Sequence, residues 1–369
     1  MTLATLDAKL DHLPPLVTQD EIQHLRERLA AVARGEAFFL EINDFLFDIG
    51  SFGAKEVWDS LRVLLQVNAV MMLRTGLPTV KVTGLTNAII EGEAEPDQAH
   101  SFDTYGQLAA ITNLTRAFAQ GGESDMRNIR RWPLRDEISD AVRADYEALV
   151  LEIRRSLDFV QACGITGTRF SPFEKAEIFV ARNVGELDLN LAAARGASGH
   201  FSPLGHLCWA GRYAPNPDLV RRFAQSDLAS PLVLSHRPGG SVAELRRMID
   251  EVGAEDAVVC LEAPVDATPQ SIAASVSELA GAIGQAPLIC RVKVAAGEDR
   301  AWELVRLAAC YNRFFDASLE HFNRLGGFSV DTAAFFQGPP PDDRLTPEET
   351  LILSFRLGTH LRDLTDQRR

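Results

Sequence analysis

Short apolar, β-branched runs alternate along the chain with longer stretches of helical spacing, and this alternation constrains the fold more than any other feature. The runs lie at 38–44, 79–85, 176–181, 206–211, 231–237, 257–263, 286–294 and 327–331. From the third run to the seventh, they begin 25 to 30 residues apart, which is the length of one strand with its crossover helix. Eight such units predict a (β/α)8 TIM-type barrel.

A doubly wound open sheet is the alternative, because it also alternates strands and helices. No Gly-x-Gly-x-x-Gly follows the first run, and eight is the barrel number, so we favour the barrel. We expect one barrel domain over 1–369, with a helical N-terminal extension at 1–35. The long gap between the second and third strands predicts an insertion at 91–150.

Charge and composition exclude several classes of protein. A net charge of −14 argues against binding to nucleic acid or to an anionic membrane surface. No apolar run is long enough to span a membrane, and no secretion signal opens the chain. The five cysteines contain no Cys-x-x-Cys pair and are expected to be reduced. We therefore expect a cytoplasmic protein, with self-association through the exposed insertion as one arrangement.

The active site of such a barrel lies at the carboxyl ends of its strands, and this rule selects candidate residues directly. Cationic and histidine side chains are expected there, with Trp209 among them: Lys81, Arg212, His236, Arg237, Arg291 and Lys293. Carboxylates are expected between them: Asp44, Glu262 and Asp331. Such a ring suits a small anionic substrate, a carboxylate or a phosphate ester. Salt bridges that close the barrel mouth are the alternative interpretation.

A set of segments in order resembles one enzyme family. The segments are GEAFFLEINDF (35–45), LLQVNAVMMLRTGLPTVKV (64–82), ACGI (162–165), AEIF (176–179), HLCWAG (206–211), ASPLVL (229–234) and DDRLT (342–346). In this order and spacing they resemble the type II 3-deoxy-D-arabino-heptulosonate 7-phosphate (DAHP) synthases. The resemblance implies a barrel enzyme that condenses phosphoenolpyruvate with erythrose 4-phosphate. It also implies a divalent metal held by Cys, His, Glu and Asp side chains.

The chain departs from that family at the metal positions. The resemblance places Phe45 at the family's cysteine and Val294 at its histidine, while Asp331 replaces a glutamate and Asp342 retains the aspartate. Two acids form a weak divalent site, because each lost ligand removes a bond that offsets dehydration of the ion. We therefore expect no divalent metal cofactor, with Asp331 and Asp342 as residual acids.

The phosphate-binding positions differ as well. The resemblance places Gly84, Ser235 and Glu262 where the family has arginine, lysine and arginine. It places Arg212 and Tyr213 where the family has a glutamate followed by an arginine, so one arginine is displaced by a position. A carboxylate at Glu262 would repel phosphoenolpyruvate. New cationic or histidine residues lie close by in the sequence, namely His236, Arg237, Arg291 and Lys293. The sequence therefore indicates a pocket whose charged residues have been replaced by others at new positions.

Three functions are consistent with these residues. The first is a repurposed, metal-independent enzyme of specialised metabolism related to the shikimate pathway, acting on a carboxylated or phosphorylated substrate. In it, His236 or Glu262 would be the general acid or base, Asp44 and Asp331 would orient the reacting groups, and the cations with Trp209 would bind the substrate. The second is a non-catalytic barrel that regulates an enzyme of aromatic biosynthesis. The third is a surviving DAHP synthase.

Overall fold

The computed structural model describes most of the chain. The described residues are 13–46, 53–87, 98–132, 134, 138–164, 176–184, 204–210, 216–226, 228, 230–297, 299–333 and 343–367.

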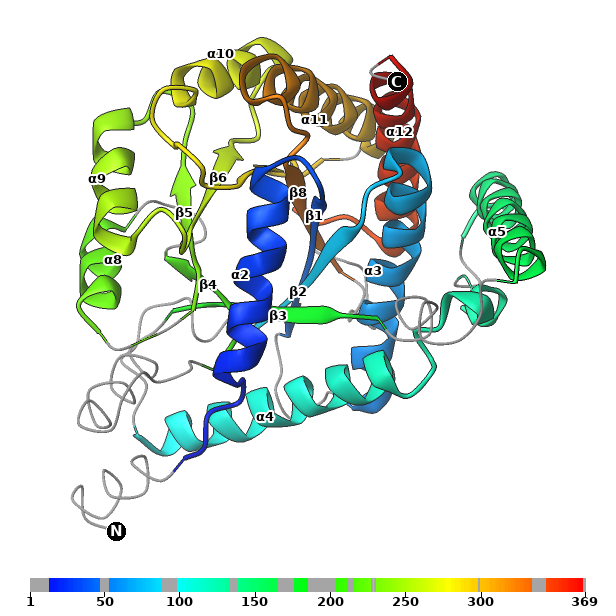
Figure 1. Cartoon of the computed structure of the whole chain (residues 1–369), viewed down its shortest axis with the longest axis horizontal. Helices are drawn as coiled ribbons and strands as arrows, with labels where there is room; N and C mark the ends of the chain where they lie inside the picture. The colour runs from blue at the N-terminus through cyan, green and yellow to red at the C-terminus, as the bar shows by residue number, and fades with distance from the viewer. Residues whose placement is uncertain are drawn as a thin grey trace.

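Eight parallel strands close into a barrel in chain order, as the alternation in the sequence predicts (Figure 1). They are β1 (Phe38–Leu46), β2 (Thr79–Asn87), β3 (Ile178–Asn183), β4 (Leu207–Ala210), β5 (Leu232–His236), β6 (Ala257–Ala263), β7 (Leu288–Val292) and β8 (Gly327–Thr332). The last strand pairs with the first, from Phe39 with Gly327 to Asp44 with Thr332, and this pairing removes every sheet edge. The predicted (β/α)8 barrel is therefore confirmed.

Helices surround the barrel and fill the long connection between its second and third strands. Outside it lie α3 (Ala54–Thr75), α8 (Pro217–Ala224), α9 (Val242–Val252), α10 (Pro269–Leu279), α11 (Arg300–Phe322) and α12 (Pro347–Asp366). The insertion predicted at 91–150 contains α4 (Gln98–Gln120), the 3-10 helix η2 (Met126–Arg131) and the start of α5 (Asp140–Ala162). The boundaries of a single domain with its extension and insertion stay predictions. No helix in the described part of the chain is long and apolar enough to cross a membrane.

Alternation along the strands separates two apolar layers. Side chains such as Phe38, Leu40 and Leu234 join the outer layer between the sheet and its helices. Their neighbours Phe39 and Val233 join a smaller inner layer that fills the barrel. Because successive side chains of a strand point to opposite faces, membership of these layers shows which residues face the barrel interior.

The N-terminal helix closes the floor of the barrel. Helix α2 (Gln19–Ala33) crosses the end of the barrel that faces the viewer in Figure 1. Its apolar face, with Leu25, Leu29 and Val32, belongs to the inner layer. These residues follow helical spacing, so they lie on one face of the helix, and the barrel buries that face.

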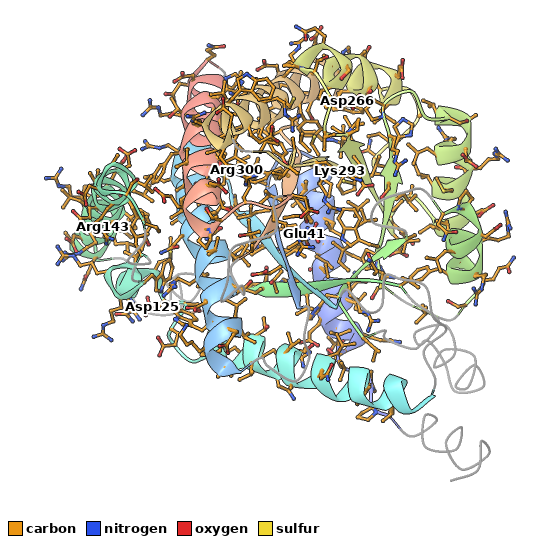
Figure 2. All side chains as sticks on the ribbon, turned by 180° about the vertical axis from the view of Figure 1, so that it is seen from behind. Glu41, Asp125, Arg143, Asp266, Lys293 and Arg300 are labelled. Atoms are coloured by element: carbon orange, nitrogen blue, oxygen red, sulfur yellow. The ribbon has the colours of Figure 1, made fainter. Side chains whose placement is uncertain are left out.

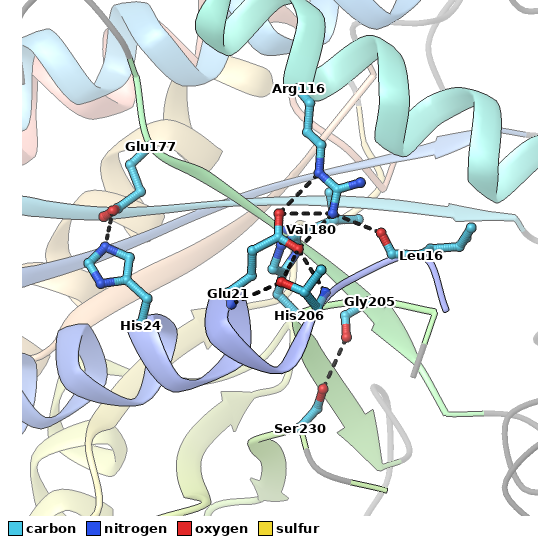
Figure 3. Close-up of polar contacts among 10 residues, drawn as sticks. Leu16, Glu21, His24, Arg116, Glu177, Val180, Gly205, His206 and Ser230 are labelled. Atoms are coloured by element: carbon cyan, nitrogen blue, oxygen red, sulfur yellow. Dashed lines mark hydrogen bonds and ion pairs between the residues drawn. The ribbon is translucent and has the colours of Figure 1, made fainter. Parts of the chain in front are cut away.

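Polar contacts fix the first turn of α2 against the barrel and α4 (Figure 3). Thr18 and Glu21 form a capping box. Arg116 of α4 donates to both carboxylate oxygens of Glu21, at 2.9 and 2.8 Å, and to the carbonyl of Leu16. Burial would raise the pKa of Glu21, but its hydrogen bonds to His206 and Thr18 and the charge of Arg116 outweigh burial and lower this pKa to about 2.

Candidate active site

Four polar side chains on adjacent strands form one level of the barrel interior. Glu262 of β6 pairs with Arg291 of β7, Arg291 pairs with Ser329 of β8, and Ser329 pairs with Glu41 of β1. All four residues are buried. They alternate with outer-layer residues of the same strands, so they face inward, above the apolar filling of the barrel.

Arg291 is held between two carboxylates. Its Nη1 donates to Oε1 of Glu262 at 3.1 Å, and its Nη2 donates to Oδ2 of Asp331. Only 2% of the Arg291 side chain is exposed, so this ion-pair network is shielded from solvent and from salt. The guanidinium is therefore fixed in place before any ligand arrives.

Trp209 crosses the barrel from β4 to reach the same level. Its Nε1 donates to Oε1 of Glu41 at 3.0 Å, and the guanidinium carbon of Arg291 lies 6.0 Å from the centre of its ring. The indole is fully buried. Trp209 thus ties opposite walls of the barrel and touches the cluster of charges with its aromatic face.

A second level lies one step nearer the mouth. Asn43 of β1 pairs with Asp331 of β8, and its Nδ2 donates to Oγ of Ser329 at 2.8 Å. Lys293 follows β7 on the same side as Arg291 and is half-buried. Glu41 and Lys293 can be located in Figure 2. Carboxylates, amides and two cations therefore line the described part of the mouth.

Ser329 is a site residue that the sequence prediction leaves out. Its neighbours Phe328 and Val330 belong to the outer layer, so alternation along β8 is the signal that identifies it.

Lys81 does not join this cluster. Its Nζ donates to the carbonyl of Thr79, two residues back along β2. Burial lowers the pKa of Lys81 to about 8, with the charge of Glu177 opposing and that of Arg28 adding to the effect. Arg28 belongs to α2, which closes the floor, so Lys81 lies towards the opposite end of the barrel from the mouth.

His236 points away from the barrel interior. Its neighbour Ser235 pairs with Cys260 of the inner layer, whereas His236 pairs with Leu261 of the outer layer. A Cβ atom added at Gly240 would lie 3.2 Å from Cε1 of His236, so the ring packs against this turn. Burial lowers the pKa of His236, and the charge of Glu278 opposes this. The structure therefore places Ser235, and not the predicted His236, on the inward side of β5.

The remaining predicted residues divide by position. Alternation along β1 places Asp44 on the outer side with Ile42, and Asp44 is buried there. Arg237 follows β5 and is exposed. Arg212 and Asp342 lie outside the described residues.

Comparison with known proteins gives this barrel a family. Residues 1–89 and 85–259 match the sequence model of the Class-II DAHP synthetase family, which is well over half of the chain. The chain belongs to this family. The resemblance noted in the sequence is thereby confirmed.

Two curated relatives support the assignment. A phospho-2-dehydro-3-deoxyheptonate aldolase of Streptomyces coelicolor is 28% identical over 69% of this chain and 63% of its own length. The aldolase AroG of Mycolicibacterium smegmatis is 27% identical over 60% of this chain and 55% of its own length. The chain thus spans less than two thirds of either relative. A tryptophan synthase structure from M. tuberculosis aligns with 10% identity and a TM-score of 0.32, from which nothing follows.

Family membership corrects one prediction. Class II DAHP synthases are metal-dependent, so the expectation that no divalent metal takes part is wrong for a member of this family.

The described residues nevertheless do not form the donor set for such an ion. Val294 packs in the outer apolar layer, and Asp331 is bonded to Arg291. Within the described ranges, no three His, Cys, Asp or Glu side chains come together.

Proposed function

We propose that this chain is a biosynthetic enzyme of the DAHP synthase type that binds a small carboxylated or phosphorylated substrate at the carboxyl-terminal mouth of its barrel. The observation that carries the proposal is Arg291, fixed by Glu262 and Asp331 beneath the half-buried Lys293. Family membership supports the reaction class. The arrangement of charges supports the position of the site, because barrels of this kind place their chemistry at this end.

The charges argue for a substrate that differs from the family's. Glu41, Glu262 and Asp331 face the same interior as Arg291 and Lys293. The resemblance noted in the sequence places Glu262 where the family has an arginine. A carboxylate at that position repels a phosphate and accepts hydrogen bonds from hydroxyl or amino groups. We infer that the substrate is related to the intermediates of aromatic biosynthesis but carries less negative charge at this point than phosphoenolpyruvate.

Glu262 is the group best placed for proton transfer. Its carboxylate is 3% exposed and is oriented by Arg291, so it can accept a proton from a substrate bound above it. His236, the other predicted acid or base, faces the helices and takes no part in this proposal. The homo-oligomer and the cytoplasmic location remain predictions.

Two substitutions test the proposal in the presence of divalent ions. The wild type is assayed with phosphoenolpyruvate, erythrose 4-phosphate and a panel of related sugar acids, with Mn²⁺, Co²⁺ or Mg²⁺ added. We expect Lys293→Met to weaken binding of the best anionic ligand roughly tenfold, because one charge-assisted hydrogen bond is lost. We expect Glu262→Gln to abolish turnover but to tighten the binding of phosphoenolpyruvate.

Lys55→Met is the matched control. Lys55 lies at the start of α3 and its side chain is 79% exposed, so its removal should leave binding unchanged. The proposal fails if Lys293→Met and Glu262→Gln both bind and turn over every ligand as the wild type does.

A further inference from the structure

Helix α11 inserts a tyrosine hydroxyl between β7 and β8 from the outer side of the barrel wall, at the level of the candidate site. Tyr311 accepts a hydrogen bond from the backbone N–H of Val292 at 3.1 Å and donates one to the carbonyl of Ser329 at 2.9 Å. The ring is fully buried and packs edge-on against Phe328, with the ring centres 5.5 Å apart. Burial raises the pKa of Tyr311 well above its ordinary value, so the hydroxyl keeps the proton that it donates.

The hydroxyl lies where β7 and β8 separate. Their register runs from Ile289 with Gly327 to Arg291 with Ser329 and ends there. On the far sides, β7 still pairs with β6 at Val292, and β8 still pairs with β1 at Asp331. Tyr311 thus bridges β7 and β8 at the point where their pairing ends, using a donor from β7 and an acceptor from β8.

Two further side chains of α11 bond to the backbone of the segment that follows β7. Nη2 of Arg306 donates to the carbonyl of Lys293 at 2.8 Å, and Oε1 of Glu303 accepts from the N–H of Ala295 at 2.8 Å. Arg306 and Glu303 also bond to each other, at 2.6 Å. Both side chains are largely buried, at 10% and 4% exposed. Helix α11 therefore bonds both to the backbone of Lys293 and, through Tyr311, to strands β7 and β8.

We propose that Tyr311 is a positioning residue, whose hydroxyl sets the separation of β7 and β8 and thereby the placement of Arg291 against Asp331 and Trp209. Arg306 and Glu303 extend the same control to Lys293. The inference rests on the proposed function in assuming that these groups meet the substrate. Tyr311 itself is on the outer side of the barrel wall and touches no ligand.

Tyr311→Phe tests the proposal by removing one oxygen atom. Without the hydroxyl, Val292 and Ser329 lose their shared partner, and the strands must close or admit water. The first readout is the fluorescence of Trp209 in the ligand-free protein, obtained by subtracting the spectrum of the corresponding Trp209→Phe variant. We expect Tyr311→Phe to change this spectrum, because Arg291 lies 6.0 Å from the Trp209 ring and its charge shifts indole emission.

The second readout is the dissociation constant of phosphoenolpyruvate with Mn²⁺, by calorimetry. We expect Tyr311→Phe to weaken binding roughly tenfold, which corresponds to about 1.4 kcal/mol. Arg306→Lys should weaken binding in the same direction, and Glu303→Gln less, since its amide oxygen can still accept from Ala295.

Tyr105→Phe is the control for simple loss of a buried hydroxyl. Tyr105 of α4 donates to the carbonyl of Pro14 at 2.7 Å, on a different face of the barrel. The Tyr105→Phe substitution should lower the melting temperature without altering the Trp209 spectrum. The inference is overturned if Tyr311→Phe leaves that spectrum unchanged, or if Tyr105→Phe alters it equally. If the wild type binds no phosphoenolpyruvate, the Trp209 spectrum still decides the role of Tyr311, because it needs no ligand.

Discussion

Lys81 and Lys293 are both lysines, but they occupy different positions in the barrel. Lys293 follows its strand and is half-buried on the inward side of the mouth. Lys81 lies near the beginning of its strand, where it donates a hydrogen bond to the carbonyl of Thr79. The charges of Arg28 and Glu177 both affect its pKa. Residue type alone therefore does not identify a site cation; the depth along the strand and the side of the sheet decide.

Lys81→Met should stabilise the protein at neutral pH. The pKa of Lys81 is lowered from 10.5 to about 8. Below pH 8 both folded and unfolded chains hold the proton, so the folded state carries the full cost of the partly buried charge. The cost diminishes as pH rises from about 8 to 10.5, because the folded state loses its proton first.

We expect Lys81→Met to raise the free energy of unfolding at pH 7 by about 1 kcal/mol, allowing for solvent screening. The gain should shrink towards zero at pH 10.5. Urea unfolding at the two pH values measures it, with the exposed Lys55→Met as control. A loss of stability at pH 7 would show that the hydrogen bond to Thr79 outweighs the buried charge.

At the scale of elements, the sequence predicts the strands and helices well and the faces of the strand ends poorly. The run at 257–263 coincides with β6, and the run at 327–331 differs from β8 only at its end. Apolar periodicity encodes these elements directly. At the strand ends the apolar pattern stops, so the sequence does not show that Ser235 faces inward and His236 outward. That orientation depends on the register with β6.

Helix α4 is an element that apolar periodicity does not predict. Its sequence contains Thr, Asn and Gly among the apolar residues, which weakens both its propensity and its pattern. Contacts with distant parts of the chain stabilise it, including the bonds of Arg116 to Glu21 and Leu16. Such contacts between residues far apart in the sequence are not encoded locally.

The contact between α2 and α4 should make the floor of the barrel sensitive to acid. The pKa of Glu21 is about 2 in the folded protein against an ordinary value of 4.5. The folded state therefore binds fewer protons than the unfolded state between these values. The contribution of the ionised Glu21 carboxylate to stability is present above pH 4.5 and is lost as pH falls towards 2.

We expect Glu21→Gln to lower stability at pH 7 and to flatten the decline of stability between pH 4.5 and 2. Thermal unfolding across this range measures both effects. Glu36→Gln is the control, because Glu36 pairs with Arg34 on the open surface and its ion pair is screened by solvent. An equally steep decline in Glu21→Gln would show that other carboxylates govern the acid response.

At the scale of the whole molecule, packed layers fill the barrel below the level of Asn43 and Asp331. The apolar face of α2 closes the floor, the inner apolar layer fills the middle, and Glu41, Ser329, Arg291 and Glu262 form a polar layer above it. Trp209 belongs to both of the upper layers, since its ring packs with the inner residues and its Nε1 reaches Glu41. The site therefore rests on a floor of packed side chains, which limits how far its charges can move.

The Trp209–Glu41 hydrogen bond should couple opposite walls of the barrel. Trp209→Phe removes the indole donor to a fully buried carboxylate, so we expect it to lower the free energy of unfolding by about 1–3 kcal/mol. In a double-mutant cycle with Glu41→Met, the losses should fall short of additivity by about 1 kcal/mol. The exposed pair Arg34 and Glu36, changed to Met and Gln, should show no measurable coupling. If Trp209→Phe and Glu41→Met are additive in urea unfolding, the hydrogen bond across the barrel contributes nothing to stability.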